Sequence, residues 1–512
     1  MTSNSQEIIQ DVRAQVEQLV DFVTGESART ATADQIERGL FKLLLALGAK
    51  LLQLFFVVRS QACSRQPLRT TAGHVLPYHR DTSRDYFSIF GKLSLARPYF
   101  YKQGVDTQIP LDAALSLGED CYSDLLREIA EYLGVYNVYG KGTDILERLL
   151  GLKLSTRALQ QTLAADAAVV EAYYAQKPPP APATEAEILV LQADGKGIPL
   201  VLDAPTESPV RLGKGEKRGH KKEAVVTTVY TIAAAPRTPE AVVASYFANP
   251  PAPPTSAAPR SRPQNKHIWA TLDGKETALV RLAHQVLQRQ GAHICHHVAL
   301  CDGCEALQSR LAARFPDFSL VLDFIHASEY LWDVANSLFG ETAPARLDWM
   351  SQQTLRVLSG HTAQVIADFR QLAQARKTTA TQRVQLHKSA NYFERNLPYM
   401  DYPTYLSHGW PIASGVIEGA CRHFVKDRCE LSGMRWTQPG AENLLRLRAA
   451  AENEDWDAYH AYRKQQRHQR LYSSASAQPE PIELQAISLP PTALDSGVST
   501  RKMSYDQLPL VA

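Results

Sequence analysis

The sequence predicts an α/β domain that is interrupted by an all-helical segment and preceded by a mainly helical N-terminal region. Short apolar runs rich in branched residues alternate with helical patterns over residues 185–326, which is typical of strands buried on both faces. Residues 327–408 show only the helical spacing of apolar residues. The proline-rich stretch 177–184 separates these patterns from the helices before it, so we expect a domain boundary there.

The composition fits a globular protein with a sizeable core. The chain has 512 residues, 45% of them hydrophobic, and a net charge of +2. Basic residues nevertheless cluster at 211–222, 422–435 and 463–470. Clustered basic charge in a near-neutral chain indicates local phosphate-facing patches, with a solvated loop as the alternative for any single cluster. Seven cysteines without regular spacing predict reduced thiols in a cytosolic protein.

Residues 1–60 predict two helices, 6–22 and 33–59, which would serve assembly or packing. The apolar run 40–58 contains two lysines and a glutamine, so we expect a buried or dimer-forming helix and no membrane span. The polar first residues show no secretory signal. We therefore expect a cytoplasmic protein, associated with the nucleoid when it acts and without a membrane partner.

Residues 61–177 predict two small units before the proline-rich stretch. Residues 61–111 contain a β-hairpin around Gly91. Residues 112–177 show the outline of a helix-turn-helix, in which a helix, a Gly-containing turn and a helix capped by Ser155 follow one another. Two helices joined by a turn are common, so plain packing is the alternative. The last helix would offer to DNA the side chains of Arg157, Gln160, Gln161 and Thr162.

Asp194 and Asp302 share one sequence context. Asp194 ends the predicted strand 188–194, Asp302 follows the predicted strand 293–301, and each precedes a glycine. Sites form at the carboxyl ends of strands in α/β sheets, and two carboxylates held close together repel unless a cation lies between them. Oxygen ligands favour Mg²⁺ or Mn²⁺. We predict a pair of metal ions held by these acids and Glu418, with a cap or turn role as the alternative for each acid alone.

The residues around these acids suit a phosphate. Gly195 and Gly197 predict a sharp turn after Asp194 and a slim backbone where DNA would pass. Residues 414–431 predict one helix, on which Arg422 and Lys426 follow Glu418 at intervals of one turn and share its face.

Two other groupings have metal-ligand or proton-transfer chemistry. Cys301 and Cys304 form a CxxC with His296 and His297 nearby, but no second pair of ligands is present, so packed thiols are the preferred interpretation. Asp323 and His326 follow the predicted strand 318–324. We expect them to hydrogen-bond to each other and orient the helical segment, with a proton relay or support of the metal ligands as the alternative.

Four segments together resemble a known family. They are ADGKGIPL at 193–200, RLGKGEKRGHKKEAVV at 211–226, DFIHASEYLW at 323–332 and the longest, GWPIASGVIEGACRHFVKDRCELSGMRW, at 409–436. With them, the chain resembles bacterial insertion-sequence transposases of the ISKra-type group, related to the Mutator-like DDE transposases. The resemblance extends over residues 85–460.

The resemblance implies an RNase H-like catalytic domain formed by residues 185–326 and 409–462, with 327–408 as a helical insertion and 471–512 as a disordered tail. It implies that Asp194, Asp302 and Glu418 are the DDE triad, and that Asp323 and His326 are the D-x-x-H signature. Asp323 remains the other candidate for the second acid. Relatives often carry a zinc-binding CxxC near the N-terminal hairpin, and this sequence has none there.

The implied function is that of a DNA transposase. It would bind the terminal inverted repeats of its element, cleave them with Mg²⁺ or Mn²⁺, and join the freed ends to target DNA. Two ends must be held together, so we expect a homodimer or larger assembly. A metal-dependent nuclease that does not join, or a non-catalytic DNA-binding descendant, are the alternatives. We expect DNA contacts from Arg157, Gln161, Lys214, Lys217, Arg218, Lys221, Lys222, Arg422, Lys426, Arg428, Arg435 and Trp436.

Overall fold

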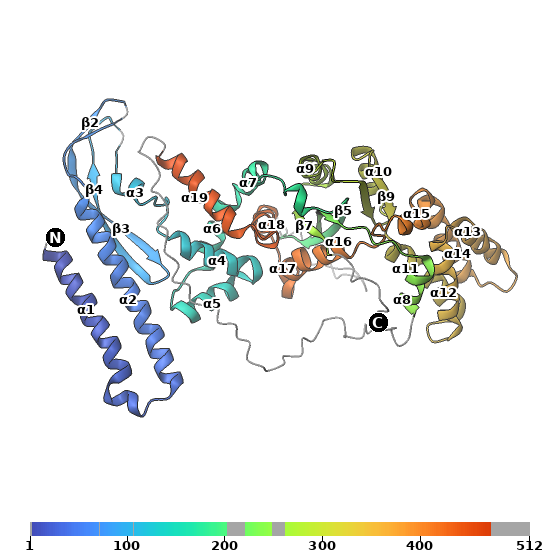
Figure 1. The fold of residues 1–512 in the computed structure, drawn as a ribbon, viewed down its shortest axis with the longest axis horizontal. Coiled ribbons are helices and arrows are strands. Elements are labelled where there is room, and N and C mark those ends of the chain that lie inside the picture. Colours follow the sequence, from blue (N-terminus) through green and yellow to red (C-terminus); the bar gives the residue numbers. More distant parts are fainter. Residues whose placement is uncertain (1–2, 71, 106, 202–220, 248–261, 473–512) are drawn as a thin grey trace, which may run out of the picture.

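The computed structural model describes residues 3–70, 72–105, 107–201, 221–247 and 262–472. The molecule is elongated, with the N-terminal helices and β-hairpin at one end, a central sheet, and a group of helices at the other end (Figure 1). Most of the Pro-rich segment 249–263, most of the basic cluster at 211–222 and nearly all of the predicted tail lie outside the described residues.

A five-stranded mixed sheet forms the centre and confirms the predicted α/β class. Its strand order is β7-β6-β5-β8-β9. β5, β6 and β7 are antiparallel to their neighbours in that group, whereas β5, β8 and β9 run parallel. The strand β7 was not predicted. The strands are β5 (Ile188–Pro199), β6 (Lys221–Ile232), β7 (Gln264–Thr271), β8 (His296–Cys301) and β9 (Ser319–Leu322).

The segment after Asp194 continues the strand, so the predicted turn is wrong. β5 pairs with β6 without a break from Ile188 to Pro199. A Cβ atom at Gly195 would collide with the side chain of Glu223 on β6. The glycine therefore accommodates a close cross-strand neighbour, and Asp194 lies inside a long strand.

Helices cover both faces of the sheet. On one face, α9 (Lys275–Gln288) and α10 (Glu305–Arg314) pack on the odd-numbered residues of β5, such as Leu189 and Leu191. On the other face lie helices from the two later parts of the chain, described next. This arrangement explains why the strands read as continuous apolar runs.

The chain between β9 and the C-terminal helices is helical throughout, as predicted. These helices, with α8 (Pro239–Phe247), pack on the face of the sheet that carries Val190 and Val298. They are α11 (Phe324–Phe339), α12 (Ala345–Leu358), α13 (Thr362–Gln374), α14 (Ala380–Asn396), the short η3 (Leu397–Tyr399) and α15 (Tyr402–Ser407).

The predicted helix 414–431 is broken into shorter types of helix. Its parts are α16 (Gly415–Gly419), the π-helical η4 (Ala420–Lys426), α17 (Asp427–Cys429) and η5 (Leu431–Gly433). Two longer helices follow, α18 (Gln438–Glu452) and the unpredicted α19 (Trp456–Tyr472). Because α19 reaches Tyr472, disorder from residue 471 onward is wrong for its first two residues.

The helix-turn-helix region shares a core with these C-terminal helices. Ser155 caps α6 through its side chain, as the sequence suggested, and Ser123 caps α4 in the same way. Residues of α4–α7, η4, α18 and the sheet form one hydrophobic cluster. The proline-rich stretch therefore does not separate two cores. The helices are α4 (Asp124–Tyr136), α5 (Tyr139–Leu150), α6 (Thr156–Ala167) and α7 (Val170–Gln176).

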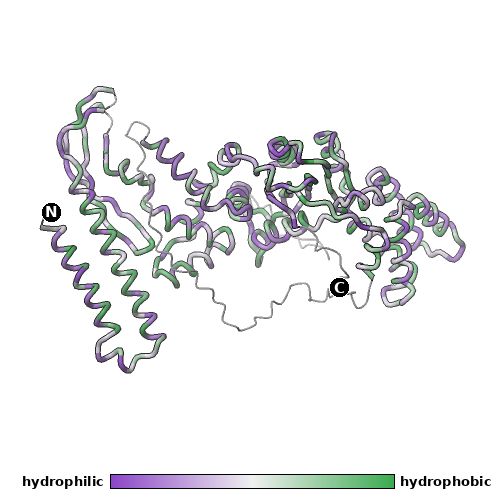
Figure 2. The backbone as a smooth tube through the Cα atoms, viewed as in Figure 1, coloured by the Kyte–Doolittle hydropathy of each residue, from purple (hydrophilic) through white to green (hydrophobic). Residues whose placement is uncertain are grey.

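The N-terminal end consists of a helical hairpin and a β-hairpin. The helices α1 (Ser3–Thr24) and α2 (Ala33–Ala62) confirm the two predicted helices. The strands β3 (Tyr78–Ser88) and β4 (Gly91–Phe100) form the predicted hairpin, with Ser88 opposite Gly91. Helix α2 is long and apolar enough to span a membrane, a test that soluble core helices and signal sequences also pass. Figure 2 shows its apolar length. All seven cysteines are free, as predicted.

Candidate functional site

Three acids lie level with one another on neighbouring parallel strands. In the register of β5 with β8, Asp194 and Asp302 each lie two residues beyond the last pair, Gln192 and Leu300. In the register of β8 with β9, Asp302 and Asp323 each directly follow the last pair. Because neighbouring strands are about 4.8 Å apart, the three carboxyl groups occupy one edge of the parallel part of the sheet.

The acids lie where two hydrophobic cores meet on one face of the sheet. Ile198 and Val226 belong to the core formed with η4 and α18. Val190 and Val298 belong to the core formed with α11–α15. Strand alternation puts Asp194 on this face, between Val190 and Ile198. The site therefore depends on helices from two separate segments of the chain.

The charges of these acids act on one another. Burial raises the pKa of Asp302, and the negative charges of Asp194 and Asp323 raise it further. The backbone N–H of Cys304, 3.1 Å from Asp302 Oδ1, and the charge of His326 oppose this rise. Like charges held this close repel, and a cation between them would relieve the repulsion.

Asp323 is fully buried and its oxygens are occupied by donors of the chain. Oδ1 accepts from the backbone N–H of Ile325 at 2.6 Å. Oδ2 accepts from the backbone N–H of Ser414 at 3.0 Å and from its hydroxyl, and His326 Nδ1 lies 3.3 Å away. Burial acts to raise the pKa of Asp323, but these hydrogen bonds outweigh it, and the pKa is lowered. The predicted hydrogen bond between Asp323 and His326 is present.

Glu418 faces the same group from α16. Its Oε1 lies 3.2 Å from the Ser414 hydroxyl and 3.9 Å from His326 Nδ1. Potential ligand atoms of Asp323, His326 and Glu418 all lie within 4.8 Å of one another. The hydrogen bond to Asp323 raises the pKa of His326 to about 9. A metal ion at this trio would have to displace a proton from His326, so its protonated ring already supplies the positive charge there.

Asp194 is bonded to the helical segment that follows Glu418. Its Oδ1 accepts from the backbone N–H of Gly195 at 2.6 Å, and its Oδ2 accepts from the Cys421 thiol at 3.2 Å. Burial raises the pKa of the Cys421 thiol, and the charges of Asp194 and Glu418 both add to the rise. One thiol on η4 therefore lies near both acids. Cys421 was not among the predicted site residues, although it stands three positions after Glu418.

Helix α14 reaches back from the helical segment to the turn that carries Asp302. Arg395 Nη2 donates to the carbonyl of Gly303 at 2.6 Å. A Cβ atom at Gly303 would lie 2.5 Å from the hydroxyl of Tyr392 and even closer to its ring. The Tyr392 hydroxyl is buried and has no hydrogen-bond partner among the described residues. The position after Asp302 thus requires glycine because an aromatic ring occupies the space of a side chain.

A second group of possible metal ligands lies among α4, α6 and α19. Glu131, Asp166 and His460 are buried with ligand atoms within 4.8 Å of one another. Arg127 and Arg463 both form ion pairs with Asp166. The same two guanidinium groups also pair with Asp120 and Asp124. The carboxylate of Asp166 therefore already has charged partners, and we assign no metal to this group. The cysteines belong to neither of the two ligand groups found among the described residues.

Several predicted DNA-contact residues are exposed. Arg157 and Gln161 lie on the outer face of α6, opposite the buried Leu159 and Leu163, whereas Thr162 is buried and unsuitable. The side chains of Arg422, Lys426 and Arg435 are exposed along the segment after Glu418. Lys221 pairs with Glu430, and Lys222 Nζ lies 2.8 Å from Gln438 Oε1. Lys214, Lys217 and Arg218 lie outside the described residues.

Two predicted DNA contacts are wrong because their side chains are in the core. The Arg428 guanidinium lies between the rings of Tyr139 and Trp436, 5.0 Å from each ring centre. Its Nη2 donates to the carbonyl of Gly134 at 2.9 Å. The Trp436 indole N–H donates to the carbonyl of Cys429 at 3.1 Å. Both residues connect the C-terminal helices to the helix-turn-helix region, and neither is available to DNA.

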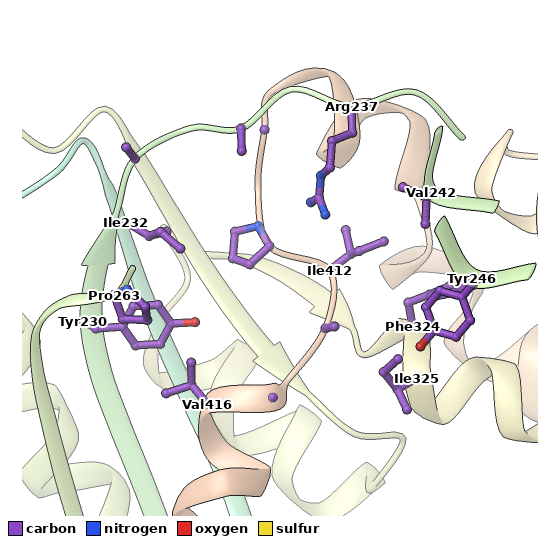
Figure 3. Close-up of a pocket in the computed structure, with 16 residues that line it drawn as sticks. Tyr230, Ile232, Arg237, Val242, Tyr246, Pro263, Phe324, Ile325, Ile412 and Val416 are labelled. Carbon is purple, nitrogen blue, oxygen red and sulfur yellow. The ribbon is translucent and has the colours of Figure 1, made fainter. Parts of the chain in front are cut away.

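An apolar cavity of about 350 Å³ adjoins the acids. Tyr230, Phe324, Ile412 and Val416 point into it (Figure 3). Phe324 follows Asp323, so the cavity lies directly beside the site, but its rim includes residues that flank 248–261. Because residues 248–261 lie outside the described ranges, we assign the cavity no ligand.

Comparison with known proteins adds no family to this geometry. No protein-family model matches the chain, and no curated protein sequence matches it.

Proposed function

We propose that the chain is a DNA transposase whose catalytic acids are Asp194, Asp302 and Glu418. One observation carries the proposal: Asp194 and Asp302 lie level on adjacent parallel strands, and the helix with Glu418 packs over that edge. Burial raises the pKa of Asp302, and the charges of Asp194 and Asp323 add to the rise, as expected where carboxylates converge.

The topology supports an RNase H-like catalytic domain. Three antiparallel strands are followed by two strands parallel to the first, and the strand order is β7-β6-β5-β8-β9. The helices α11–α15 stand between β9 and the helix with the third acid, where the resemblance expects an insertion. Helix α14 contacts the turn after Asp302, so this insertion would also shape the site.

The carboxylate chemistry of the three acids suits one or two Mg²⁺ or Mn²⁺ ions, although the two groups of described residues with ligand atoms within 4.8 Å of one another contain neither Asp194 nor Asp302. Asp194, Asp302 and Glu418 offer carboxylate oxygens, the ligands these ions prefer. When bound, the ions would activate water or a DNA 3′-hydroxyl and stabilise the leaving oxygen. Asp302 is a better second ligand than Asp323, because Asp323 is fully buried with both oxygens hydrogen-bonded, whereas among the described residues Asp302 accepts through Oδ1 alone. Asp194 also accepts through both oxygens, but one of its donors is the weakly donating Cys421 thiol. Asp323 would instead orient His326 and the helix of Glu418.

DNA would follow the exposed polar and basic residues outside the site. Arg157 and Gln161 on α6 are accessible for base edges or phosphates. Arg422 and Lys426 follow Glu418 and would bind phosphates beside the reacting bond. The activity would require two copies of the chain to hold two element ends together, in the cytoplasm and on nucleoid DNA.

A strand-transfer assay tests the proposal. Purified protein, Mg²⁺, target plasmid and pre-cleaved DNA ends of the encoding element would be incubated together. We expect joined products that form with the wild type and are absent with Asp302→Asn. Cutting of uncleaved ends without joining would indicate a nuclease, and end binding without either product would indicate a non-catalytic DNA-binding protein.

A further inference from the structure

Helix α2 carries an exposed apolar seam with a seven-residue repeat. Phe41, Leu44, Leu51, Phe55 and Val58 are each between 39% and 54% exposed. Phe41 and Phe55 stand fourteen positions apart, and Leu44, Leu51 and Val58 stand seven apart. These residues therefore occupy the a and d positions of three successive heptads, the pattern of helices that pack against other helices in a coiled coil.

The one gap in this repeat is filled by a residue from another element. Gly48 occupies the missing a position between Phe41 and Phe55. A Cβ atom at Gly48 would lie 2.5 Å from the ring of Phe90, at the tip of the β-hairpin. Phe90 thus supplies an apolar side chain where the helix itself has none.

Other residues of α2 contact α1 and the β-hairpin. Phe22 of α1 packs on Gly39, where a side chain would collide with its ring. Gln53 Nε2 donates to the Ser94 carbonyl of β4 at 3.0 Å, and Phe56 stacks edge-on against Tyr86 at 5.0 Å. Among the described residues, the large apolar side chains of α2 that are exposed are those of the heptad seam.

Helix α1 extends the apolar surface. Val16, Val20 and Val23 are exposed at spacings of four and three residues. On a helical hairpin, this stripe and the seam of α2 flank the contact between the two helices on the same side. The hairpin therefore resembles half of a four-helix bundle, which is completed by a second pair of helices.

We propose that the seam of α2, with the valine stripe of α1, is the surface on which a second copy of this chain docks. Eight exposed apolar residues supply a large part of the roughly 800 Å² per partner that a specific interface buries. The heptad repeat, interrupted at Gly48, favours another helix as the occupant, and a second copy brings the same heptad. The inference rests on the proposed function in one respect, since paired element ends require paired chains.

A lipid bilayer does not fit this surface. A spanning α2 would be surrounded by lipid, which would remove α1 and β4 from its covered faces. It would also bring Lys42, Lys50 and Gln53 into the hydrocarbon layer, where charged side chains are costly.

Sedimentation velocity of the full-length protein without DNA tests the interface. We expect the wild type to dimerise or form a larger assembly at micromolar concentration. Leu44→Asp/Leu51→Asp should weaken association by about a hundredfold or more, because two charges would enter the seam. Ala46→Asp, at the exposed f position of the same heptad, should associate like the wild type. Circular dichroism would show whether the aspartate variant retains its α-helix content. If it does not, the milder variant Leu44→Ser/Leu51→Ser is measured in its place.

Two outcomes would overturn the inference. The first is a wild type that stays monomeric, including one that instead floats with vesicles of anionic lipid. The second is a folded seam variant that associates as tightly as Ala46→Asp. Because association is measured without DNA or metal, the result can be interpreted even if the protein shows no catalytic activity. A dimer that cannot join DNA would contradict only the proposed function.

Discussion

The backbone amide of Ser414 donates a 3.0 Å hydrogen bond to the buried carboxylate of Asp323, and the Ser414 hydroxyl donates to the same oxygen. Ser414 immediately precedes α16, and its hydroxyl also lies 3.2 Å from Glu418. The end of β9 is thereby tied to the helix that carries the third acid. The position of Glu418 depends on Asp323, although we assign Asp323 no metal.

Replacing Ser414 tests this connection. Ser414→Ala removes one donor to a buried charge, and we expect a loss of about 1–3 kcal/mol in the free energy of unfolding. Cleavage should fall as well, because Glu418 loses its support. Ser407→Ala is the control, since the Ser407 hydroxyl is exposed and bonds only within its own turn. Chemical denaturation measures both, and equal stability of the two variants would refute the connection.

The stability contributed by His326 should depend on pH. Its pKa is raised from 6.5 to about 9 by Asp323, so folding favours the protonated ring. The contribution is complete below pH 6.5 and is lost as the pH rises through 9. The melting temperature of the wild type should exceed that of His326→Gln at pH 6, and the difference should shrink by pH 9.5. A difference that is constant over this range would contradict the ion pair.

Gly303→Ala should be harmful because its methyl group would meet the ring of Tyr392. We expect about 1–3 kcal/mol of destabilisation from overpacking and a displaced Asp302. Gly140→Ala is the matched control, since nothing lies within 4 Å of that Cβ position. Gly303→Ala/Tyr392→Leu should recover stability. Thermal melting compares the three, and a Gly303→Ala variant as stable as Gly140→Ala would argue against the contact.

Two arginines in the same segment should respond in opposite ways. Arg428→Met should lower stability by about 3 kcal/mol or more, because a buried carbonyl and two ring faces lose their partner. Arg422→Met should change the free energy of unfolding by no more than about 0.5 kcal/mol. It should weaken DNA binding, and the number of ions released on binding, read from the salt dependence of the affinity, should fall by about one. Denaturation and binding titrations at several salt concentrations separate the two. Unfolding by Arg422→Met, or a DNA-only effect of Arg428→Met, would reverse the assignments.

The elements predicted from the sequence are those in which burial sets the spacing of apolar residues. β5, β6 and β8 read as branched apolar runs because the sheet is covered on both faces. β7 escaped prediction because its first half, from Gln264 to His267, is polar and only its second half is buried. α19 was not predicted for a related reason. Its side chains are largely polar and are held by ion pairs such as Arg467 with Asp124, so the helix lacks a clear apolar pattern.

The candidate site could be predicted only in part. Asp194 and Asp302 were found because each stands at the end of an apolar run, but their level placement depends on strand order, which periodicity does not encode. The burial of Arg428 arises where α5 meets the C-terminal helices, and a basic residue in a basic cluster gives no sign of it. The fit of Tyr392 over Gly303 likewise joins residues about ninety positions apart.

The most direct test of the account is cleavage of the element ends in Mg²⁺ by the wild type and by Glu418→Gln, with end binding measured in parallel. Glutamine keeps the shape of the side chain and removes the charge. Wild-type cleavage, its loss by at least about a hundredfold in the variant, and end binding within about twofold of the wild type are the predicted results. Cleavage by Glu418→Gln at the wild-type rate would contradict the assignment of Asp194, Asp302 and Glu418 as the catalytic acids.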